Sequence, residues 1–188
     1  MRTTFLFVSV IFFVIGCSSA KKVVSAEQQQ KVEKLVTTKS FKIDSEWAYP
    51  MVTNSLISLQ NAGFFPNNST ASMIDITGHN QYFEFNKDSV NASLPYYGER
   101  QMGAAYSRSN GGGIEFNGVP ENYTMTKTKR GDYRIKFKIK DKNALTETYN
   151  VSLLIYNNMS AKINVFSSNR FKIEYRGKLK ELKKETEI

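Results

Sequence analysis

The spacing of hydrophobic residues along the chain changes from a helical to a strand period after the first forty positions. Between Ala26 and about Thr38 apolar residues recur at helical spacing, and Ser25 begins a Ser-x-x-Gln capping box just before them. From residue 41 onward the period is two, and in 133–140 apolar residues alternate strictly with Arg or Lys. The pattern therefore predicts one N-terminal helix followed by a domain made of β-strands.

Similar alternation over 149–155, 161–165 and 171–176 predicts further strands, with turn residues between them. Turn signals recur about every 8–12 residues, a spacing typical of an all-β sandwich or small barrel. We therefore expect a mainly β fold, an antiparallel meander forming a small sandwich or barrel. Leu154 and Phe166 fall out of phase with their neighbours, so the sheet has apolar positions on its second face, and the N-terminal helix is the nearest candidate to cover them.

The first residues of the chain carry an apolar run of a different kind. Residues 5–15 are apolar apart from one serine, and they follow the positively charged Arg2. Eleven helical residues reach roughly 16 Å, about half of the hydrocarbon core of a bilayer, which suits a secretory signal and is too short for a stable span. We expect residues 1–16 to be a signal peptide that is cleaved after Gly16.

The end of this run, Val14-Ile15-Gly16-Cys17, resembles the lipobox of bacterial lipoprotein precursors. The resemblance implies that the Cys17 thiol is alkylated with diacylglycerol, that the peptide is cut before it, and that the new amine is acylated. Two or three acyl chains would anchor the protein firmly, because a single chain gives only marginal binding. An ordinary signal peptide with a chance cysteine is the alternative.

These features divide the chain into four parts. Residues 1–16 form the lipoprotein signal peptide, 17–24 a lipidated tether, 25–178 a single mainly-β domain with its N-terminal helix, and 179–188 a charged tail. No acidic residue follows the lipidated cysteine until Glu27. By analogy with lipoprotein sorting signals, this favours a location in the bacterial cell envelope, at the outer membrane facing the periplasm.

Composition restricts the chemistry that the domain can perform. The chain has a single Cys and a single His, which excludes internal disulfides, cysteine-based metal sites and most histidine-dependent catalytic triads. We expect neither a cofactor nor a metal, and no enzymatic activity. Lys and Arg number 26 against 17 Asp and Glu, a formal net charge of +9, so an anionic partner is favoured.

Two segments are candidate binding surfaces. In residues 94–100 a proline and a glycine shape a turn that carries Tyr96, Tyr97 and Arg100, an aromatic platform for a sugar ring or a peptide. Its alternative is a structural turn whose tyrosines plug the end of the sheet. Lys136 and Lys138 belong to a cationic strip on adjacent strands that would contact an anionic ligand, or would simply be a solvated strand face.

Five short segments, in order, resemble a family of exported bacterial lipoproteins known as domain of unknown function 4251. They are residues 48–50, 94–98, 111–116, 165–170 and 173–177, among them Leu-Pro-Tyr-Tyr-Gly and Gly-Gly-Gly-Ile-Glu-Phe. The resemblance implies a compact single domain that is secreted or lipid-anchored. It supplies no activity, ligand or catalytic residue.

The leading hypothesis is a lipid-anchored cell-envelope protein that acts as a non-catalytic binding or scaffold domain. Its partners would be the membrane, through the lipid anchor, and an anionic envelope ligand or a protein. The expected location disfavours nucleic acid, so we expect none, and the oligomeric state stays open. One alternative is a lipocalin-like carrier of an apolar ligand. Another is a hydrolase of envelope glycans that uses two carboxylates from a set comprising Asp75, Glu84, Glu115 and Asp132.

Overall fold

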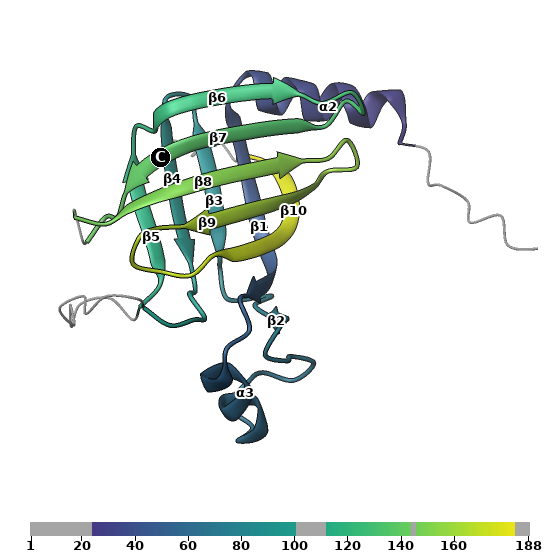
Figure 1. Cartoon of the computed structure of the whole chain (residues 1–188). Helices are drawn as coiled ribbons and strands as arrows, with labels where there is room; N and C mark the ends of the chain where they lie inside the picture. The colour runs from purple at the N-terminus through teal and green to yellow at the C-terminus, as the bar shows by residue number, and fades with distance from the viewer. Residues whose placement is uncertain (1–23, 101–111, 144–145, 183–188) are drawn as a thin grey trace, which may run out of the picture.

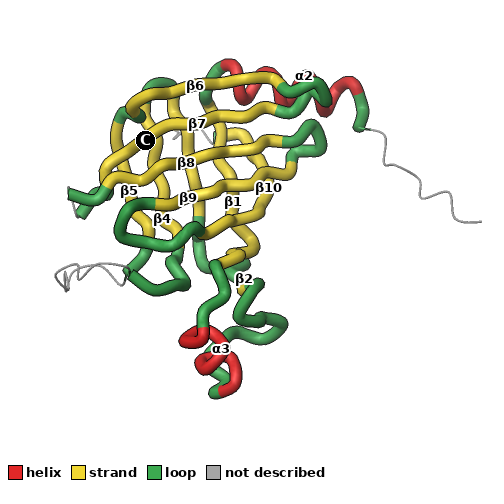
Figure 2. The backbone as a smooth tube through the Cα atoms, in the orientation of Figure 1, coloured by secondary structure: helices red, strands yellow, loops and turns green. Residues whose placement is uncertain are grey.

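The computed structural model of the protein describes residues 24–100, 112–143 and 146–182. The expected signal peptide, Cys17, the tether up to residue 23 and residues 183–188 of the expected tail lie outside the described residues. The described part of the chain forms two helices and ten strands. Figures 1 and 2 show how they are arranged in space. In chain order they are α2 (Ala26–Thr37), β1 (Ser40–Pro50), α3 (Asn54–Asn61), β2 (Ile74–Asp75), β3 (Tyr82–Asn86), β4 (Ser89–Leu94), β5 (Ile114–Gly118), β6 (Glu121–Lys127), β7 (Tyr133–Lys140), β8 (Thr148–Ile155), β9 (Ser160–Phe166) and β10 (Ile173–Glu181).

The strands form one curled antiparallel sheet in the order β5-β4-β3-β1-β10-β9-β8-β7-β6, with β2 paired to β1 beside this path. β1 and β10 pair in the middle and join two wings, and Figure 1 shows the strands of one wing crossing in front of those of the other. The predicted mainly β fold and its antiparallel meander are confirmed. The closure is that of a half-barrel, because the edge strands β5 and β6 are not neighbours in the sheet.

Alternation along the strands sends one set of side chains into the space between the wings. β7 follows a strict buried–exposed pattern over its eight residues, as its sequence predicts. Aromatic rings join the two wings: Phe137 of β7 lies 6.1 Å from Phe83 of β3 and 6.4 Å from Phe116 of β5, measured between ring centroids. The rings stack at a tilt or edge to face, arrangements that stabilise beyond their buried area.

Helix α2 begins at Ser25, whose side chain accepts a hydrogen bond from the backbone N–H of Gln28 at 3.2 Å. The predicted helix and its capping residue are confirmed. Its apolar stripe packs into the inner core through Val32, Leu35 and Val36. The expectation that this helix covers the outer apolar positions is wrong, because its only apolar stripe packs against the inner core. On the outer face Phe166 remains 51% exposed.

Two further differences concern elements that the sequence pattern did not reveal. α3 is a short helix between β1 and β2, in a stretch for which no element was predicted. β10 continues through Glu181, so residues 179–181 of the expected charged tail lie in the sheet and the domain boundary at 178 moves outward. The reason is that Leu179 keeps the strand period and pairs with Ile43 of β1, burying its side chain.

Candidate functional site

A trough of about 680 Å³ lies on the outer face of strands β6 to β9, the wing nearest the viewer in Figure 1. We call it the basic trough. Side chains reach it because successive residues of a strand point to opposite faces, so those between the core residues of β7 point outward. Its lining residues are Asn122, Thr124, Arg134, Lys136, Phe137, Lys138, Asn150, Val151, Ser152, Leu154, Asn164, Phe166 and Lys172.

The basic trough carries four cationic side chains and no acidic one: Arg134, Lys136, Lys138 and Lys172. Within the described residues, none of these four takes part in an ion pair with a carboxylate. Glu121 of β6 lies opposite Lys138 in the β6–β7 register, but the two side chains form no ion pair. Glu174 of β10 is paired with Arg176 at 2.7 Å and with Lys162 at 3.8 Å. The lining of the trough therefore has a net positive charge, and none of its cations is held in an ion pair within the described residues.

Between the cations the trough offers apolar surface and hydrogen-bonding groups. The ring of Phe166 is about half exposed, and Leu154 pairs across the sheet with Arg134. The Oδ1 atom of Asn164 is buried at the trough and has no hydrogen-bond partner in the described chain. Buried polar atoms are normally satisfied, so this carbonyl oxygen is available to a donor supplied by a ligand or water.

The structure brings Lys136 and Lys138 together in this trough with Arg134, which belongs to the same predicted strip, and adds Lys172 to them. Sequence reasoning did not connect Lys172 with the strip, because it follows β9 and reaches the trough only through the order of strands. The out-of-phase apolar residues of β8 and β9, Leu154 and Phe166, indicated in the sequence that this face also carries apolar side chains.

The residues of the aromatic turn lie elsewhere. Tyr96 and Tyr97 are half-buried and pack against the core, and neither lines the trough. The Tyr96 hydroxyl donates to the Glu99 carbonyl at 3.0 Å, and burial raises the pKa of this phenol. Arg100 is exposed, and its backbone forms an isolated bridge with Arg170. A ligand-binding role for this turn stays a prediction.

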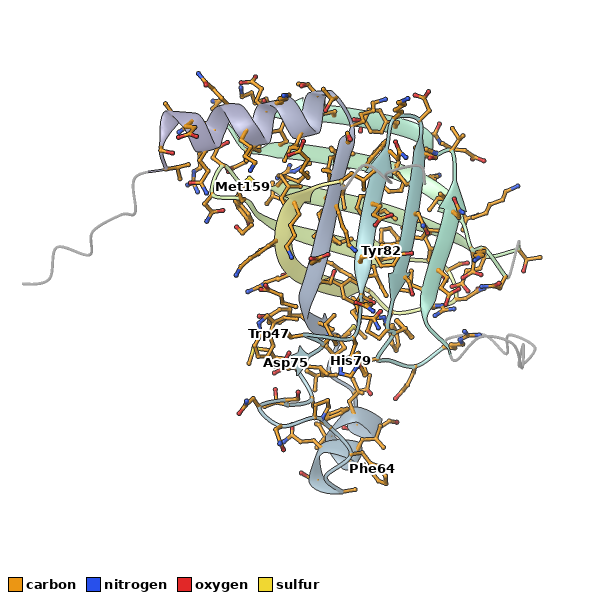
Figure 3. All side chains as sticks on the ribbon, turned by 180° about the vertical axis from the view of Figure 1, so that it is seen from behind. Trp47, Phe64, Asp75, His79, Tyr82 and Met159 are labelled. Carbon is orange, nitrogen blue, oxygen red and sulfur yellow. The ribbon has the colours of Figure 1, made fainter. Side chains whose placement is uncertain are left out.

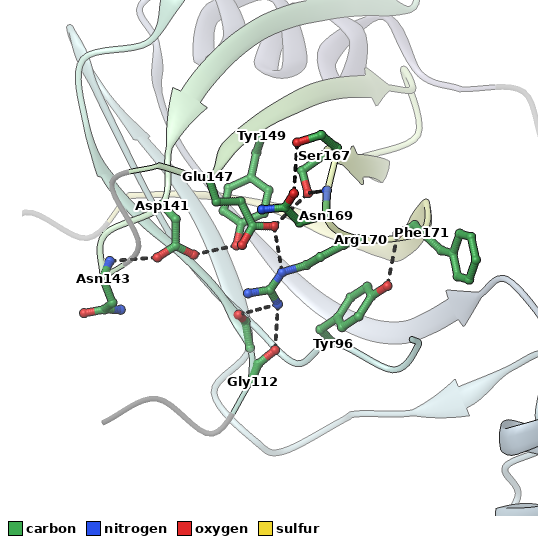
Figure 4. A network of polar contacts seen from close by, with 12 residues as sticks. Tyr96, Gly112, Asp141, Asn143, Glu147, Tyr149, Ser167, Asn169, Arg170 and Phe171 are labelled. Carbon is green, nitrogen blue, oxygen red and sulfur yellow. Dashed lines mark hydrogen bonds and ion pairs between the residues drawn. The ribbon is translucent and has the colours of Figure 1, made fainter. Parts of the chain in front are cut away.

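Figure 4 shows a buried polar network centred on Arg170, next to this turn. The guanidinium Nε lies 2.9 Å from Glu147 Oε1, and both side chains are less than 5% exposed. Its Nη1 donates to the carbonyl oxygens of Gly112 and Gly113 at 2.7 and 2.9 Å. Arg170 also lies 5.1 Å from the ring of Tyr96, in a cation–π arrangement. The network thus fastens the strand that begins at Ile114 to the segment between β9 and β10.

A second buried acid lies beside this network. Tyr149 donates a hydrogen bond to Asp141 Oδ2 at 2.5 Å, and Asp141 Oδ1 accepts from the backbone of Asn143 at 2.7 Å. Burial, and then the hydrogen bond to Asp141, raises the pKa of Tyr149 far above its usual value. Asp141 and Glu147 are at most 4% exposed, so their role is to order this end of the sheet.

The four carboxylates considered for a hydrolase have separate partners. Asp75 accepts from the N–H of Thr77, Glu84 pairs with Lys42, Glu115 accepts from Asn143, and Asp132 accepts from the N–H of Asn157. No hydrogen bond or ion pair in the described chain links two of the four. The described part of the chain therefore links no two of these four carboxylates in the way that the hydrolase alternative requires.

The carrier alternative requires free space between the wings. In the described part of the chain this space holds packed aromatic side chains, with ring centroids 5.7 to 6.5 Å apart across the cluster. An apolar ligand would have to displace them.

The described residues contain no group of three or more His, Cys, Asp or Glu side chains arranged to hold a metal ion. Neither of their helices is long and apolar enough to cross a bilayer.

Comparisons with known proteins agree with this architecture. A search of the curated proteins found no match. Among solved structures, a DUF4251 family protein from Bacteroides eggerthii superposes with a TM-score of 0.54 at 12% sequence identity, covering 83% of this chain and 89% of that one. At this identity the likeness shows a shared fold. The family model for a domain of unknown function, DUF4251, matches residues 24–179, which is most of the chain. The protein therefore belongs to the DUF4251 family.

Proposed function

We propose that the protein is a lipid-anchored component of the bacterial cell envelope that binds an anionic, sugar-containing ligand in the basic trough, without catalysing a reaction on it. The observation that carries the proposal is the set of four cations that line one trough and form no ion pair with a carboxylate of the described chain. Unpaired cations held close together repel one another, so an anion that enters between them relieves repulsion as well as gaining attraction.

The remaining lining favours a sugar over a bare ion. A half-exposed aromatic ring can cover the apolar face of a sugar, while Asn150, Asn164 and Ser152 offer amide and hydroxyl groups to sugar hydroxyls. The volume of about 680 Å³ falls within the range of small-ligand sites, roughly 300–1,000 Å³, and suits a short oligosaccharide. An outer-membrane location facing the periplasm would expose the trough to acidic and phosphorylated envelope glycans.

The binding test uses the purified full-length protein in a non-ionic detergent, with a heparin tetrasaccharide as the anionic probe and maltotetraose as the neutral one. Isothermal titration calorimetry should detect only the anionic probe. Lys136→Ala combined with Lys138→Ala should weaken that binding by about tenfold or more, because two charge-assisted contacts are lost. Lys140→Ala is the matched control, because Lys140 is exposed on the same strand and face but does not line the trough.

Two results would overturn the trough as the binding site. Equal affinity of the double variant and Lys140→Ala would show that general positive charge, and not the trough, attracts the probe. Binding that does not weaken between about 0.1 M and about 1 M salt, where the Debye length falls from roughly 10 to 3 Å, would exclude an electrostatic site.

The anchor is tested separately. Cells labelled with palmitate should incorporate the label into the wild-type protein and not into Cys17→Ala, because that variant lacks the only thiol of the chain. Equal labelling of the two proteins would refute lipidation at this residue.

A further inference from the structure

The segment from Trp47 to Ile74 contains no Asp, Glu, Lys, Arg or His. In a chain of which 23% is charged, a stretch of this length would carry about six charged residues at average composition. The segment includes the end of β1, helix α3 and the connection to β2. Its neutrality sets it apart from the rest of a strongly basic protein.

Within this segment, residues 51–64 expose large apolar side chains, and we call them the apolar tip. α3 has one buried residue, Leu56. Figures 1 and 3 show α3 projecting from the end of the sheet away from α2, with Phe64 labelled near its far end. The exposed members are Met51 (47%), Val52 (47%), Ile57 (42%), Leu59 (42%) and Phe64 (75%).

Ordered backbone holds these side chains in place. The side chain of Thr53 caps the start of α3 by accepting from the N–H of Leu56 at 3.3 Å. At the other end the N–H of Gly63 bonds to the Gln60 carbonyl at 3.0 Å, and the N–H of Phe64 bonds to the Leu59 carbonyl at 3.1 Å. These two bonds, with Gly63 at φ +74°, form a Schellman cap. The most exposed aromatic residue of the tip is thus displayed by a defined turn.

The composition of the tip indicates the medium that would surround it. Residues 51–73 carry no charged side chain, so no ion would have to be desolvated if lipid surrounded the tip. Ile57 and Leu59 are two positions apart on the helix, roughly 200° around its axis, so apolar side chains lie on different sides of α3 and not along one stripe. A surface that is apolar on several sides and carries no charge suits an environment that surrounds it on all of them.

We propose that the apolar tip inserts into the interfacial region of a lipid bilayer. Large apolar side chains gain from burial at the boundary of headgroups and acyl chains, and the Asn, Ser, Thr and Gln residues around them remain hydrated at headgroup level. The proposal rests on the proposed envelope location, since a bilayer must be within reach. It does not depend on a ligand in the basic trough.

The test places a tryptophan at the tip of the full-length protein, reconstituted in vesicles of brominated phosphatidylcholine. Bromine quenches tryptophan only at short range, and the chain has a single native tryptophan, Trp47, as a constant background. Fluorescence of Phe64→Trp should be quenched at least about twofold more than that of Val119→Trp. Val119 is the matched control, because it is 71% exposed and lies outside the tip, between β5 and β6.

Insertion driven by apolar contact should persist when salt rises from about 0.1 M to about 1 M, whereas binding in the basic trough should not. Equal quenching of the two variants would overturn the insertion. So would a doubled molecular mass that Phe64→Ser abolishes, because the tip would then be covered by a second copy of the chain. Palmitate labelling reports on the anchor and heparin binding on the trough, so a failure of the proposed function is recognised independently of the tip.

Discussion

Replacing Arg170 by Met tests whether the buried network holds the end of the sheet together. The variant removes the ion pair with Glu147, in which the two side chains are 4% and 3% exposed. Glu147 would keep a hydrogen bond from the Ser167 hydroxyl at 2.7 Å but lose its countercharge. The carbonyl oxygens of Gly112 and Gly113 would lose the guanidinium donor as well. A methionine side chain of similar length fills the space without supplying any of these contacts.

The expected loss is about 3–5 kcal/mol in the free energy of unfolding, the usual cost of leaving one member of a buried ion pair unpaired. Urea unfolding followed by circular dichroism measures it. With a urea slope of roughly 1–3 kcal/mol/M for a domain of this size, the midpoint should fall by about 1–5 M. The control is Arg176→Met, because Arg176 is 46% exposed in its pair with Glu174 and such surface pairs contribute about 0–1 kcal/mol.

A second variant separates the lost ion pair from a general packing defect. Arg170→Met combined with Glu147→Leu removes both charges, and replacing both members of a buried pair by apolar residues is often neutral. The double variant should therefore recover most of the stability lost by Arg170→Met alone. The reasoning is refuted if Arg170→Met loses no more than Arg176→Met, or if removing Glu147 as well deepens the loss.

Three further predictions follow from single positions. Gly177→Ala should prevent cooperative thermal unfolding, because a Cβ there would collide with the backbone carbonyl of Asp44 on β1; Lys178→Ala, its exposed neighbour, should not. Burial raises the pKa of Tyr149 and of Tyr175, whereas tyrosines in the unfolded chain ionise near pH 10. The stability that these two neutral phenols contribute should therefore be complete below about pH 10 and fall as the pH rises above it. The urea midpoint measured at about pH 11 should be lower than the midpoint at about pH 8. An unchanged midpoint would contradict this. Ser25→Ala should cost about 0.5–2 kcal/mol in urea unfolding by removing the cap of α2, and a loss outside that range would contradict the capping role.

Strict alternation made the C-terminal strands predictable, whereas helix α3 could not be found in the same way. β7 has an apolar residue at every second position, and only an extended strand with one buried face explains that pattern. α3 spans eight residues, of which only Leu56 is buried. Because only one residue packs against the fold, apolar residues do not recur at helical spacing in its sequence. A segment that projects from the fold lacks the constraint that the core imposes on patterning.

The candidate sites show the same division. Lys136 and Lys138 were predictable because they are neighbours on one strand, but Lys172 joins them only through strand order. The burial of two acids was also predictable from the sequence. Asp141 and Glu147 fall on the odd-numbered positions that point inward along β7 and β8, so the alternation assigns both carboxylates to the core. The arginine that neutralises one of them follows a turn, where no periodicity remains to locate it.

The arrangement of charge on this protein argues that the basic trough is more than a solvated strand face. Lys136 and Lys138 are two positions apart on β7, so their α-carbons lie roughly 6.6 Å apart on the same face. Neither forms an ion pair in the described chain, although Glu121 lies opposite Lys138 on β6. β10 carries three cations at the same spacing, and each of them forms an ion pair: Arg176 with Glu174, Lys178 with Glu46 and Lys180 with Asp44. Lys127 of β6 and Lys162 of β9 form ion pairs as well, whereas the four cations that line the trough form none in the described chain. Because unpaired like charges weaken a fold, the four cations without an ion pair in a single trough support the proposed ligand, which would supply negative charge there.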